Sequence, residues 1–172
     1  IICISDPEEA AARDARMKAD LKARNFKPVP TDICHLGPGA CCADTAHAGE
    51  LSGQGVVEAQ GKRDRFDQAV GCGWMVLGLN ADPAQALTED QRAQLATLGG
   101  RMVRIGAPGS PCDAVDVEGT YAQGLDGIGA TYVLLRPDFY VAATASSAEA
   151  LRHRFDEVMS RLHIPATAPA LV

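Results

Sequence analysis

The chain has 172 residues, of which 47% are hydrophobic and 22% are charged, and its formal net charge is -6 at pH 7. This length suits a single domain that builds a core without disulfides. The negative charge gives nucleic acid and anionic membranes no general attraction, so we expect neither as a partner. No apolar run approaches the ~20 residues of a membrane span, which predicts a soluble protein.

The first segment predicts a helix. The chain begins Ile1-Ile2-Cys3-Ile4, without a methionine or the basic segment of a signal peptide, so we expect a fragment of a longer protein. Asp6 suits the N-cap, Pro7 the first helical position and Glu9 the reciprocal position of a capping box. The predicted helix covers about residues 6–24, and its inner face consists mainly of alanine.

The next segment predicts an irregular connection. Hydrophobic periodicity stops over residues 25–55, where proline and glycine recur throughout. Loops of this length are uncommon inside a compact domain, so we interpret the segment as a linker that wraps over a neighbouring domain. The compact domain is then predicted over residues 56–165, and residues 166–172 form a C-terminal tail.

The remaining segments alternate between strand and helix patterns. The predicted strands are 56–59, 74–79, 102–105, 131–135 and 139–143, and the predicted helices begin near Thr88, Val117 and Ser146. Thr88 with Gln91 and Ser146 with Glu149 have capping-box spacing, and Gly99 suits a left-handed helix end. The order β, β, α, β, α, β, β, α predicts an α/β fold, in which a mixed central sheet is flanked by helices. This order resembles the thioredoxin fold.

Thiol chemistry is not expected from this version of the fold. In thioredoxins the redox Cys-x-x-Cys follows the central strand at the start of a helix, where the helix terminus lowers the pKa of a thiol. The corresponding stretch here, residues 80–85, contains no cysteine, and residues 129–131 lack the fold's cis-proline. An alternative stays open, namely a free-standing thioredoxin-like or peroxiredoxin-like protein that uses Cys72 or Cys112.

Cysteine spacing favours reduced thiols over a disulfide framework. The six cysteines are irregularly spaced at positions 3, 34, 41, 42, 72 and 112, which is typical of a cytoplasmic protein. Zinc ligands are available in Cys34, His35, Cys41, Cys42 and His47. Their spacing lacks the Cys-x2-to-4-Cys pairs of common zinc sites, so a zinc-binding module ranks last among the alternatives.

Other polar residues give weaker signals. His153 and His163 lie on the predicted last helix, where solvated histidines are common, and Asp113 and Asp116 lie in an acidic loop. The chain has no G-x-G-x-x-G, G-x-x-x-x-G-K-[ST] or G-x-S-x-G motif. We therefore predict no catalytic, cofactor-binding or metal-binding residues in this chain.

The stretch "ATYVLLRPDFYVAA" predicts two strands joined by a turn. Pro137 suits position i+1 and Asp138 position i+2 of a type I turn. Arg136 has two possible roles, an ion pair with Asp138 across the turn or a contact with a domain outside the chain.

Nearly the whole chain resembles the C-terminal part of FAD-dependent aromatic hydroxylases, the group A flavoprotein monooxygenases. The similar stretches are "IICISDPEEAAARDARM", "GELSGQGVVEAQGKRDRFDQAVGCGWMVLGL" and "GATYVLLRPDFYVAATA". The subgroup is that of 3-(3-hydroxyphenyl)propionate hydroxylase, with phenol and resorcinol hydroxylases as relatives.

The resemblance implies a thioredoxin-like last domain without redox cysteines. Residues 1–55 would then combine the tail of an upstream substrate domain with the linker. The parent enzyme would use FAD and NADH or NADPH to hydroxylate phenolic compounds in aromatic catabolism, with both cofactors bound upstream. The chain by itself would be inactive and would support the upstream FAD and substrate domains of the same polypeptide or a homodimer interface.

Overall fold

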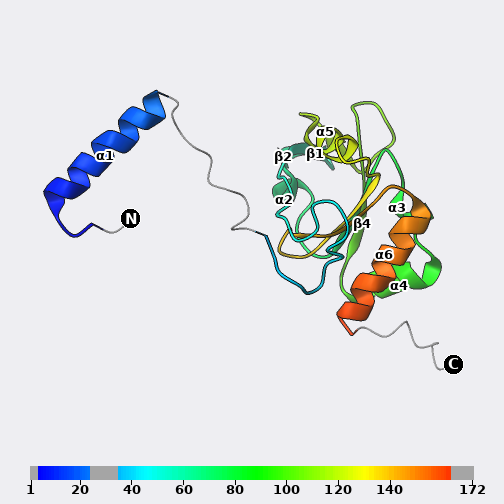
Figure 1. Cartoon of the computed structure of the whole chain (residues 1–172). Coiled ribbons are helices and arrows are strands. Elements are labelled where there is room, and N and C mark those ends of the chain that lie inside the picture. The colour runs from blue at the N-terminus through cyan, green and yellow to red at the C-terminus, as the bar shows by residue number, and fades with distance from the viewer. Residues whose placement is uncertain (1–3, 24–34, 164–172) are drawn as a thin grey trace. The chain divides into compact units, whose positions relative to one another are not determined.

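The computed structural model describes residues 4–23 and 35–163 of the chain. These residues divide into two compact units, Ile1–Ile33 and Cys34–Val172 (Figure 1). The first unit contains helix α1 (Pro7–Lys22), which buries none of its residues. Asp6 caps this helix as predicted, because its carboxylate accepts hydrogen bonds from the N–H groups of Glu8 (2.8 Å) and Glu9 (3.0 Å). Among the described residues, no helix is long and apolar enough to cross a membrane.

The second unit contains a seven-stranded sheet in the order β2-β1-β5-β4-β3-β6-β7. The pairs β3–β4 and β4–β5 are parallel and the other pairs are antiparallel, which confirms the predicted mixed sheet. The strands are β1 (Val56–Ala59), β2 (Lys62–Arg65), β3 (Met75–Leu79), β4 (Arg101–Gly106), β5 (Ala114–Asp116), β6 (Tyr132–Leu135) and β7 (Val141–Ala145). The helices are α2 (Phe66–Ala69), α3 (Pro83–Ala86), α4 (Glu89–Thr97), α5 (Thr120–Asp126) and α6 (Ala148–Arg161).

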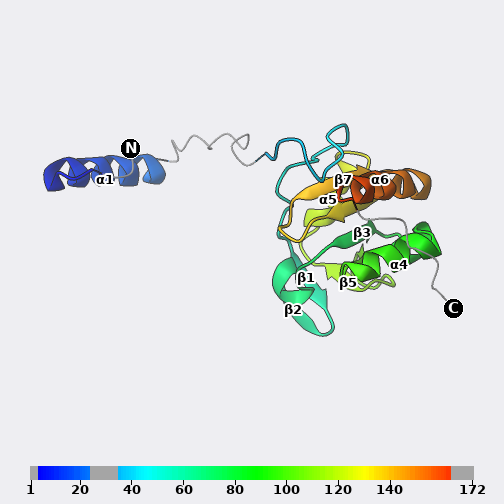
Figure 2. The same cartoon turned by 90° about the horizontal axis from the view of Figure 1, so that it is seen from below.

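Two core clusters lie against the sheet. Strand β3 is buried throughout and alternates between them, with Leu77 in the cluster that includes Leu125 of α5 and Val76 in the cluster that includes Leu95 of α4 and Phe155 of α6. Figure 2 shows α4 and α6 together along one side of the sheet. Helices therefore cover the sheet as the sequence predicts.

The connections follow the thioredoxin-like order. Strands β3 and β4 form a parallel pair across α4, and the hairpin β6–β7 leads into α6. The predicted capping box of α4 is present, with the Thr88 side chain and the Gln91 side chain each bonded to the other's backbone N–H at 3.2 Å. Gly99 follows α4 with φ of +63°, as expected for its end. The fold class predicted from sequence is thus confirmed.

Three predicted boundaries are wrong. The last helix is capped by Ser147, whose hydroxyl accepts from the N–H of Ala150 at 3.1 Å, and not by Ser146. Helix α5 begins at Thr120 and not at Val117, because β5 occupies the residues just before. The final strand begins at Val141, because Phe139 has φ of +64° and still belongs to the turn.

Residues 42–52 pair along the outer edge of β7. The N–H of Cys42 donates to the carbonyl of Ala142 (2.7 Å), and the N–H of Gly49 donates to that of Val141 (2.9 Å). Leu51 forms a further bridge with Tyr140. These bonds satisfy strand groups that would otherwise lack partners, so the compact unit includes residues 35–55, which the sequence suggests as a linker. The assignment of residues 1–55 to an upstream substrate domain stays a prediction.

Candidate functional site

The turn after β3 contains a helix cap where a thioredoxin has its thiols. The carboxylate of Asp82 accepts from the N–H of Ala84 at 2.9 Å, and Pro83 is the first residue of α3. Helix α3 packs very close to β3, since a Cβ at Gly78 would collide with the carbonyl oxygen of Ala81 and lie 3.1 Å from Pro83. The described residues contain no cis peptide bond, so the bond at Ala130, where a thioredoxin has its cis-proline, is trans. This turn therefore serves packing and capping.

The two cysteines of the redox alternative lie apart from that turn along the chain. Cys72 is exposed and precedes β3, and its carbonyl accepts a bond from Arg101 at 2.7 Å. Cys112 is partly buried and follows β4. Both thiols are free, as are those of Cys41 and Cys42. No disulfide therefore joins the cysteines within the described part of the chain.

The segment that contains the five available zinc ligands, residues 34–47, has a buried thiol at Cys42. Cys34 lies outside the described residues. Cys42 is fully buried, and burial, together with a hydrogen bond to Glu157, raises the pKa of its thiol to about 12. A protonated thiol is a poor zinc ligand. Across residues 4–23 and 35–163, no group of three or more His, Cys, Asp or Glu side chains is placed to hold a metal ion.

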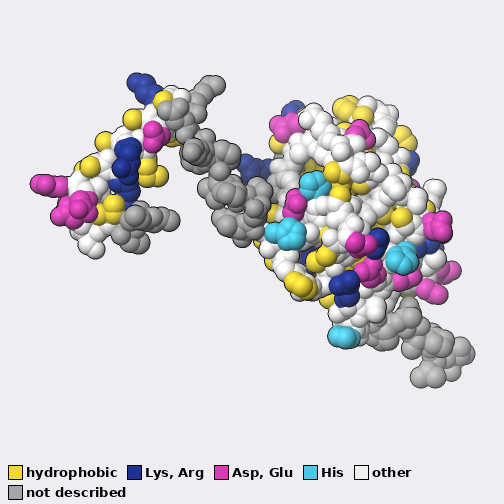
Figure 3. Space-filling view, in the orientation of Figure 1, with side chains coloured by type: hydrophobic (Ala, Val, Ile, Leu, Met, Phe, Trp, Pro, Cys, Tyr) yellow, Lys and Arg dark blue, Asp and Glu magenta, His cyan; other side chains and the backbone are white. Residues whose placement is uncertain are grey.

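The remaining candidates from the sequence are two aspartates, Asp113 and Asp116, and two histidines on or near helix α6. A carboxylate oxygen of Asp113 accepts from the N–H of Arg104 at 2.8 Å. Asp116 is buried and accepts from the N–H groups of Tyr121 and Ala122 at the start of α5. Both carboxylates thus bond to backbone, and His153 and His163 are exposed. On the face of the larger unit seen in Figure 3, acidic and basic side chains are interspersed.

The Arg-Pro-Asp stretch forms the predicted turn. The N–H of Phe139 donates to the carbonyl of Arg136 at 3.0 Å, which places Pro137 and Asp138 at the two central positions. Arg136 holds Asp138 with two bonds, Nε to Oδ1 at 3.1 Å and Nη2 to Oδ2 at 2.8 Å. Desolvation raises the pKa of Asp138, but the bonds from Arg136 and from the backbone outweigh it and lower the pKa. The ion pair predicted as one role of Arg136 is therefore confirmed.

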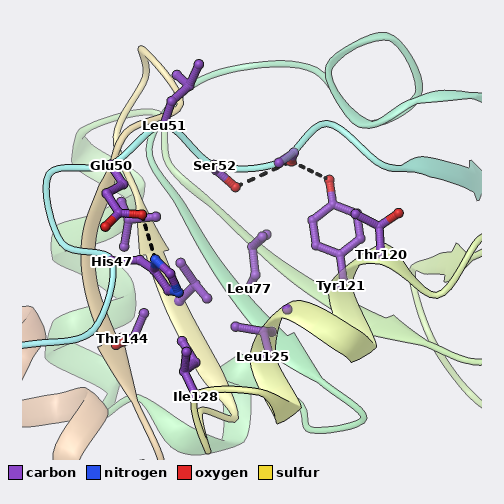
Figure 4. Close-up of a pocket in the computed structure, with 14 residues that line it drawn as sticks. His47, Glu50, Leu51, Ser52, Leu77, Thr120, Tyr121, Leu125, Ile128 and Thr144 are labelled. Carbon is purple, nitrogen blue, oxygen red and sulfur yellow. Dashed lines mark hydrogen bonds and ion pairs between the residues drawn. The ribbon is translucent and has the colours of Figure 1, made fainter. Parts of the chain in front are cut away.

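The sequence patterns do not predict a cavity of about 330 Å³ that is open at the surface of the larger unit. It lies between α5, the adjoining sheet face and the segment 47–53 (Figure 4). Its aliphatic wall on the sheet and α5 side consists of Leu77, Leu125, Ile128, Val133 and Val141, and Leu51 lines it from the segment 47–53. Polar side chains of the segment 47–53 lie opposite them, so the cavity combines an aliphatic wall with a polar rim.

The polar rim includes a paired histidine. Nδ1 of His47 lies 2.6 Å from Oε2 of Glu50, and both side chains are half exposed. The hydroxyl of Tyr121 donates to the carbonyl of Gly53 at 3.2 Å, and that of Thr144 donates to the carbonyl of Ala46 at 3.0 Å. Burial raises the pKa of Tyr121, which keeps its hydroxyl protonated.

This cavity does not fit FAD. Its volume is near the lower end of the ~300–1,000 Å³ of small-molecule sites, far from the space that a dinucleotide fills. The cavity lining, all within the described residues, includes no lysine or arginine to bind a pyrophosphate. Glu50 at its rim would repel one. The cavity can instead hold a small apolar molecule.

The known proteins that this chain resembles in sequence include hydroxylases of aromatic compounds. The chain is 29% identical over 170 residues to a probable NADH-specific resorcinol 4-hydroxylase of Rhodococcus jostii, covering 96% of this chain and 31% of that protein. It is 31% identical over 150 residues to a 3-(3-hydroxy-phenyl)propionate/3-hydroxycinnamic acid hydroxylase of Burkholderia vietnamiensis, covering 78% and 27%. The chain thus spans under a third of the length of these relatives.

Solved structures support the same fold. Aklavinone-11 hydroxylase, in a ternary complex with FAD and aklavinone, matches with a TM-score of 0.54 and 24% identity over 78% of this chain and 28% of that one. The anhydrotetracycline hydroxylase OxyS of Streptomyces rimosus matches with a TM-score of 0.50 and 17% identity over 74% and 23%. These likenesses support the fold.

The family model of the HcaD C-terminal domain matches residues 49–160. This range contains every strand of the sheet and most of the cavity lining. The resemblance to aromatic hydroxylases predicted from sequence is confirmed by the resorcinol and hydroxyphenylpropionate hydroxylases among the relatives. The chain belongs to the HcaD C-terminal domain family.

Proposed function

We propose that this chain is the C-terminal, thiol-inactive domain of a larger FAD-dependent monooxygenase that hydroxylates phenolic compounds. The observation that carries the proposal is the turn after β3, where Asp82 caps a helix and no thiol is present. The relatives named as hydroxylases support the parent activity, and the chain accounts for 27–31% of their length. Its role is structural.

In the parent enzyme, FAD reduced by NADH or NADPH supplies the chemistry that adds an oxygen atom from O₂ to the ring. We assign the binding of FAD, NAD(P)H and substrate to upstream domains of the same polypeptide. The Rhodococcus relative is named as NADH-specific, which favours NADH. This chain contributes packing surfaces, and the parent belongs in the cytoplasm, where free thiols such as Cys72 are kept reduced.

Helix α1 supports a role in packing on another domain. Met17 and Leu21 are four residues apart, on one side of the helix, and are 61% and 69% exposed. An apolar stripe of this kind is stabilised when it is buried against a partner. We assign that partner to the upstream domains of the same polypeptide, with a homodimer contact as the second candidate.

The structural role is tested on the purified 172-residue chain. We expect no insulin reduction, no bound yellow flavin and no NADH or NADPH oxidation in the presence of resorcinol. The Cys72→Ser and Cys112→Ser variants should behave like the wild type. Insulin reduction that either serine variant abolishes would favour the free-standing redox alternative, and bound FAD with resorcinol-dependent NADH oxidation would contradict the structural role.

The parent activity is tested on the longer polypeptide that carries this chain. We expect it to bind FAD and to consume NADH or NADPH faster when resorcinol or 3-(3-hydroxyphenyl)propionate is added. A ring-hydroxylated product in mass spectrometry would support the proposal. A polypeptide without flavin, or one whose product lacks the added oxygen, would contradict it.

A further inference from the structure

The cavity beside α5 has the size of a site for a small ring compound. Its volume of about 330 Å³ is at the lower end of the range for small-molecule sites. Leu77, Val133 and Val141 line it from the sheet, and Leu125 and Ile128 line it from α5 and the turn that follows. Aliphatic walls of this kind favour the faces of an uncharged ring.

The charges around the cavity disfavour an anionic ligand. Glu50 is the acidic residue at the rim, and neither lysine nor arginine lines the cavity among the residues that the structure describes. A carboxylate placed against the aliphatic wall would lose part of its water shell without gaining an ion pair. The ligand is therefore not an anion, and because Glu50 is already bonded to His47, the rim has no unpaired carboxylate among the described residues to attract a cation.

The imidazole of His47 gives the cavity a hydrogen-bond acceptor. The hydroxyl hydrogens of Tyr121 and Thr144 are already donated to backbone carbonyls. Nδ1 of His47 lies 2.6 Å from Oε2 of Glu50, and a carboxylate only accepts, so the neutral tautomer that fits this bond has its proton on Nδ1. In the neutral imidazole, Nε2 then has a free lone pair. Figure 4 shows the imidazole beside the aliphatic side chains, on the cavity side of Glu50.

His47 also has an unfavourable backbone conformation. Its φ is +59°, in the left-handed region that costs a non-glycine residue about 1–2 kcal/mol. The turn that holds it is closed by a 2.9 Å bond from the N–H of Glu50 to the carbonyl of His47. Such strain often occurs at ligand-binding positions, and here it places a histidine at the rim where glycine or asparagine would be easier to accommodate.

We propose that this cavity binds a neutral monocyclic phenol. The ring packs between Leu77, Leu125 and the neighbouring aliphatic side chains, and the phenolic hydroxyl donates a hydrogen bond to Nε2 of His47. The site lies entirely within residues 47–144, so the inference is independent of the function proposed for the parent enzyme.

The first test compares two isomers on the 172-residue chain by isothermal titration calorimetry. p-Cresol donates a hydrogen bond, and anisole, which has the same atoms, cannot. We expect one equivalent of p-cresol to bind saturably and anisole to bind about tenfold more weakly, since one hydrogen bond contributes about 1.4 kcal/mol. Benzoate should not bind. Absence of saturable p-cresol binding, or equal affinity for both isomers, would overturn the proposal.

The second test uses two pairs of variants. His47→Gly tolerates the positive φ and should weaken p-cresol binding about tenfold without changing anisole binding. Its matched control is His163→Gly, another exposed histidine with positive φ (+54°), at the end of α6. Unchanged p-cresol affinity in His47→Gly would contradict the assigned hydrogen bond.

The second pair fills the cavity. Gly124 lines it, and a Cβ there meets no atom within 4 Å, so Gly124→Leu should occupy the space without disturbing the fold. We expect this variant to lose binding of both isomers. Gly39→Leu, at a site that is equally open but outside the cavity lining, should bind p-cresol like the wild type. Circular dichroism checks that each variant is folded, and p-cresol binding retained in folded Gly124→Leu would place the ligand elsewhere.

Discussion

Five residues other than glycine have positive φ in the described structure, and one of them lies in a two-residue hairpin turn. They are His47, Gln60, Asn80, Phe139 and His163. Gln60 and Gly61 (φ +52° and +77°) form the two-residue turn between β1 and β2, with Ala59 paired to Lys62. Positive φ at both positions is typical of a type I′ turn, for which Asn-Gly is the preferred sequence. Gln60 therefore carries strain that asparagine would reduce.

Gln60→Asn is expected to increase the free energy of unfolding by about 0.5–1 kcal/mol, because asparagine enters the left-handed region more easily. Urea unfolding followed by circular dichroism measures the change. Gln68→Asn, at an exposed position of helix α2, is the matched control and should give no gain. A Gln60→Asn variant no more stable than the control would show that the turn is not strained.

Ion pairs join helix α6 to Asp44, which follows Cys41 and Cys42 in the chain. Arg154 bonds Asp44 (2.7 and 3.1 Å) and Glu157 (2.9 Å), and Glu157 also bonds Arg161 (2.7 Å). The bond from Arg161 is the largest cause that lowers the pKa of Glu157 to about 2, against its usual 4.5. The network covers the buried Cys42, whose thiol lies 3.8 Å from the carbonyl of Arg154.

Glu157→Gln is expected to lower the free energy of unfolding at pH 7 by about 1–2 kcal/mol, less than the pKa change alone implies because solvent screens the pair. The pKa is lower in the folded protein, so this stabilisation is complete above about pH 4.5 and disappears as the pH falls through about 2. Urea unfolding of both proteins at pH 7 and pH 2 measures this. Glu149→Gln is the control, and a difference at pH 2 as large as that at pH 7 would contradict the assigned ion pair.

Sequence patterns located the elements that local signals define. The caps at Asp6 and Thr88 and the turn at Pro137 each depend on side chains within three residues. Strand β2 was not predicted, because its sequence KRDR is entirely charged and only its pairing with β1 makes it a strand. Two adjacent serines give the same capping signal, so the spacing could not distinguish Ser147 from Ser146.

The cavity could not be predicted from sequence. Its lining comes from segments near residues 47–53, 77, 120–128 and 133–144, which only the folded sheet brings together. From sequence, His47 is only one of five available zinc ligands, in a spacing that ranks a zinc site last among the alternatives. The structure pairs it with Glu50, three residues away, in a contact that a metal-ligand pattern does not consider.

The compact unit as a whole depends on residues upstream of its first strand. A chain of residues 56–172 would lose the bonds of Cys42 and Gly49 to β7, together with the bonds between Thr144 and residues 45–46. We expect it to unfold at lower urea concentration and to associate as concentration rises, because the edge of β7 is uncovered. Light scattering and urea unfolding measure both effects.

The matched control is a chain of residues 35–172, which retains these bonds and lacks only α1 and the segment after it. It should have the stability of the whole chain. If residues 56–172 unfold at the same urea concentration as the control and stay monomeric, the segment 35–55 is not part of the folded unit.

The charge of strand β2 affects whether two molecules can pair their sheets edge to edge. The segment 62–65 carries three positive charges and one negative charge, a net charge of +2 (+3 - 1). Two copies that met edge to edge through β2 would bring +2 against +2 over four residues, and that repulsion opposes fibre formation. At the opposite edge of the sheet, residues 42–52 of the same chain already pair with β7. Both edges of the sheet are therefore protected against pairing with a second molecule, β2 by charge repulsion and β7 because its hydrogen bonds are already made.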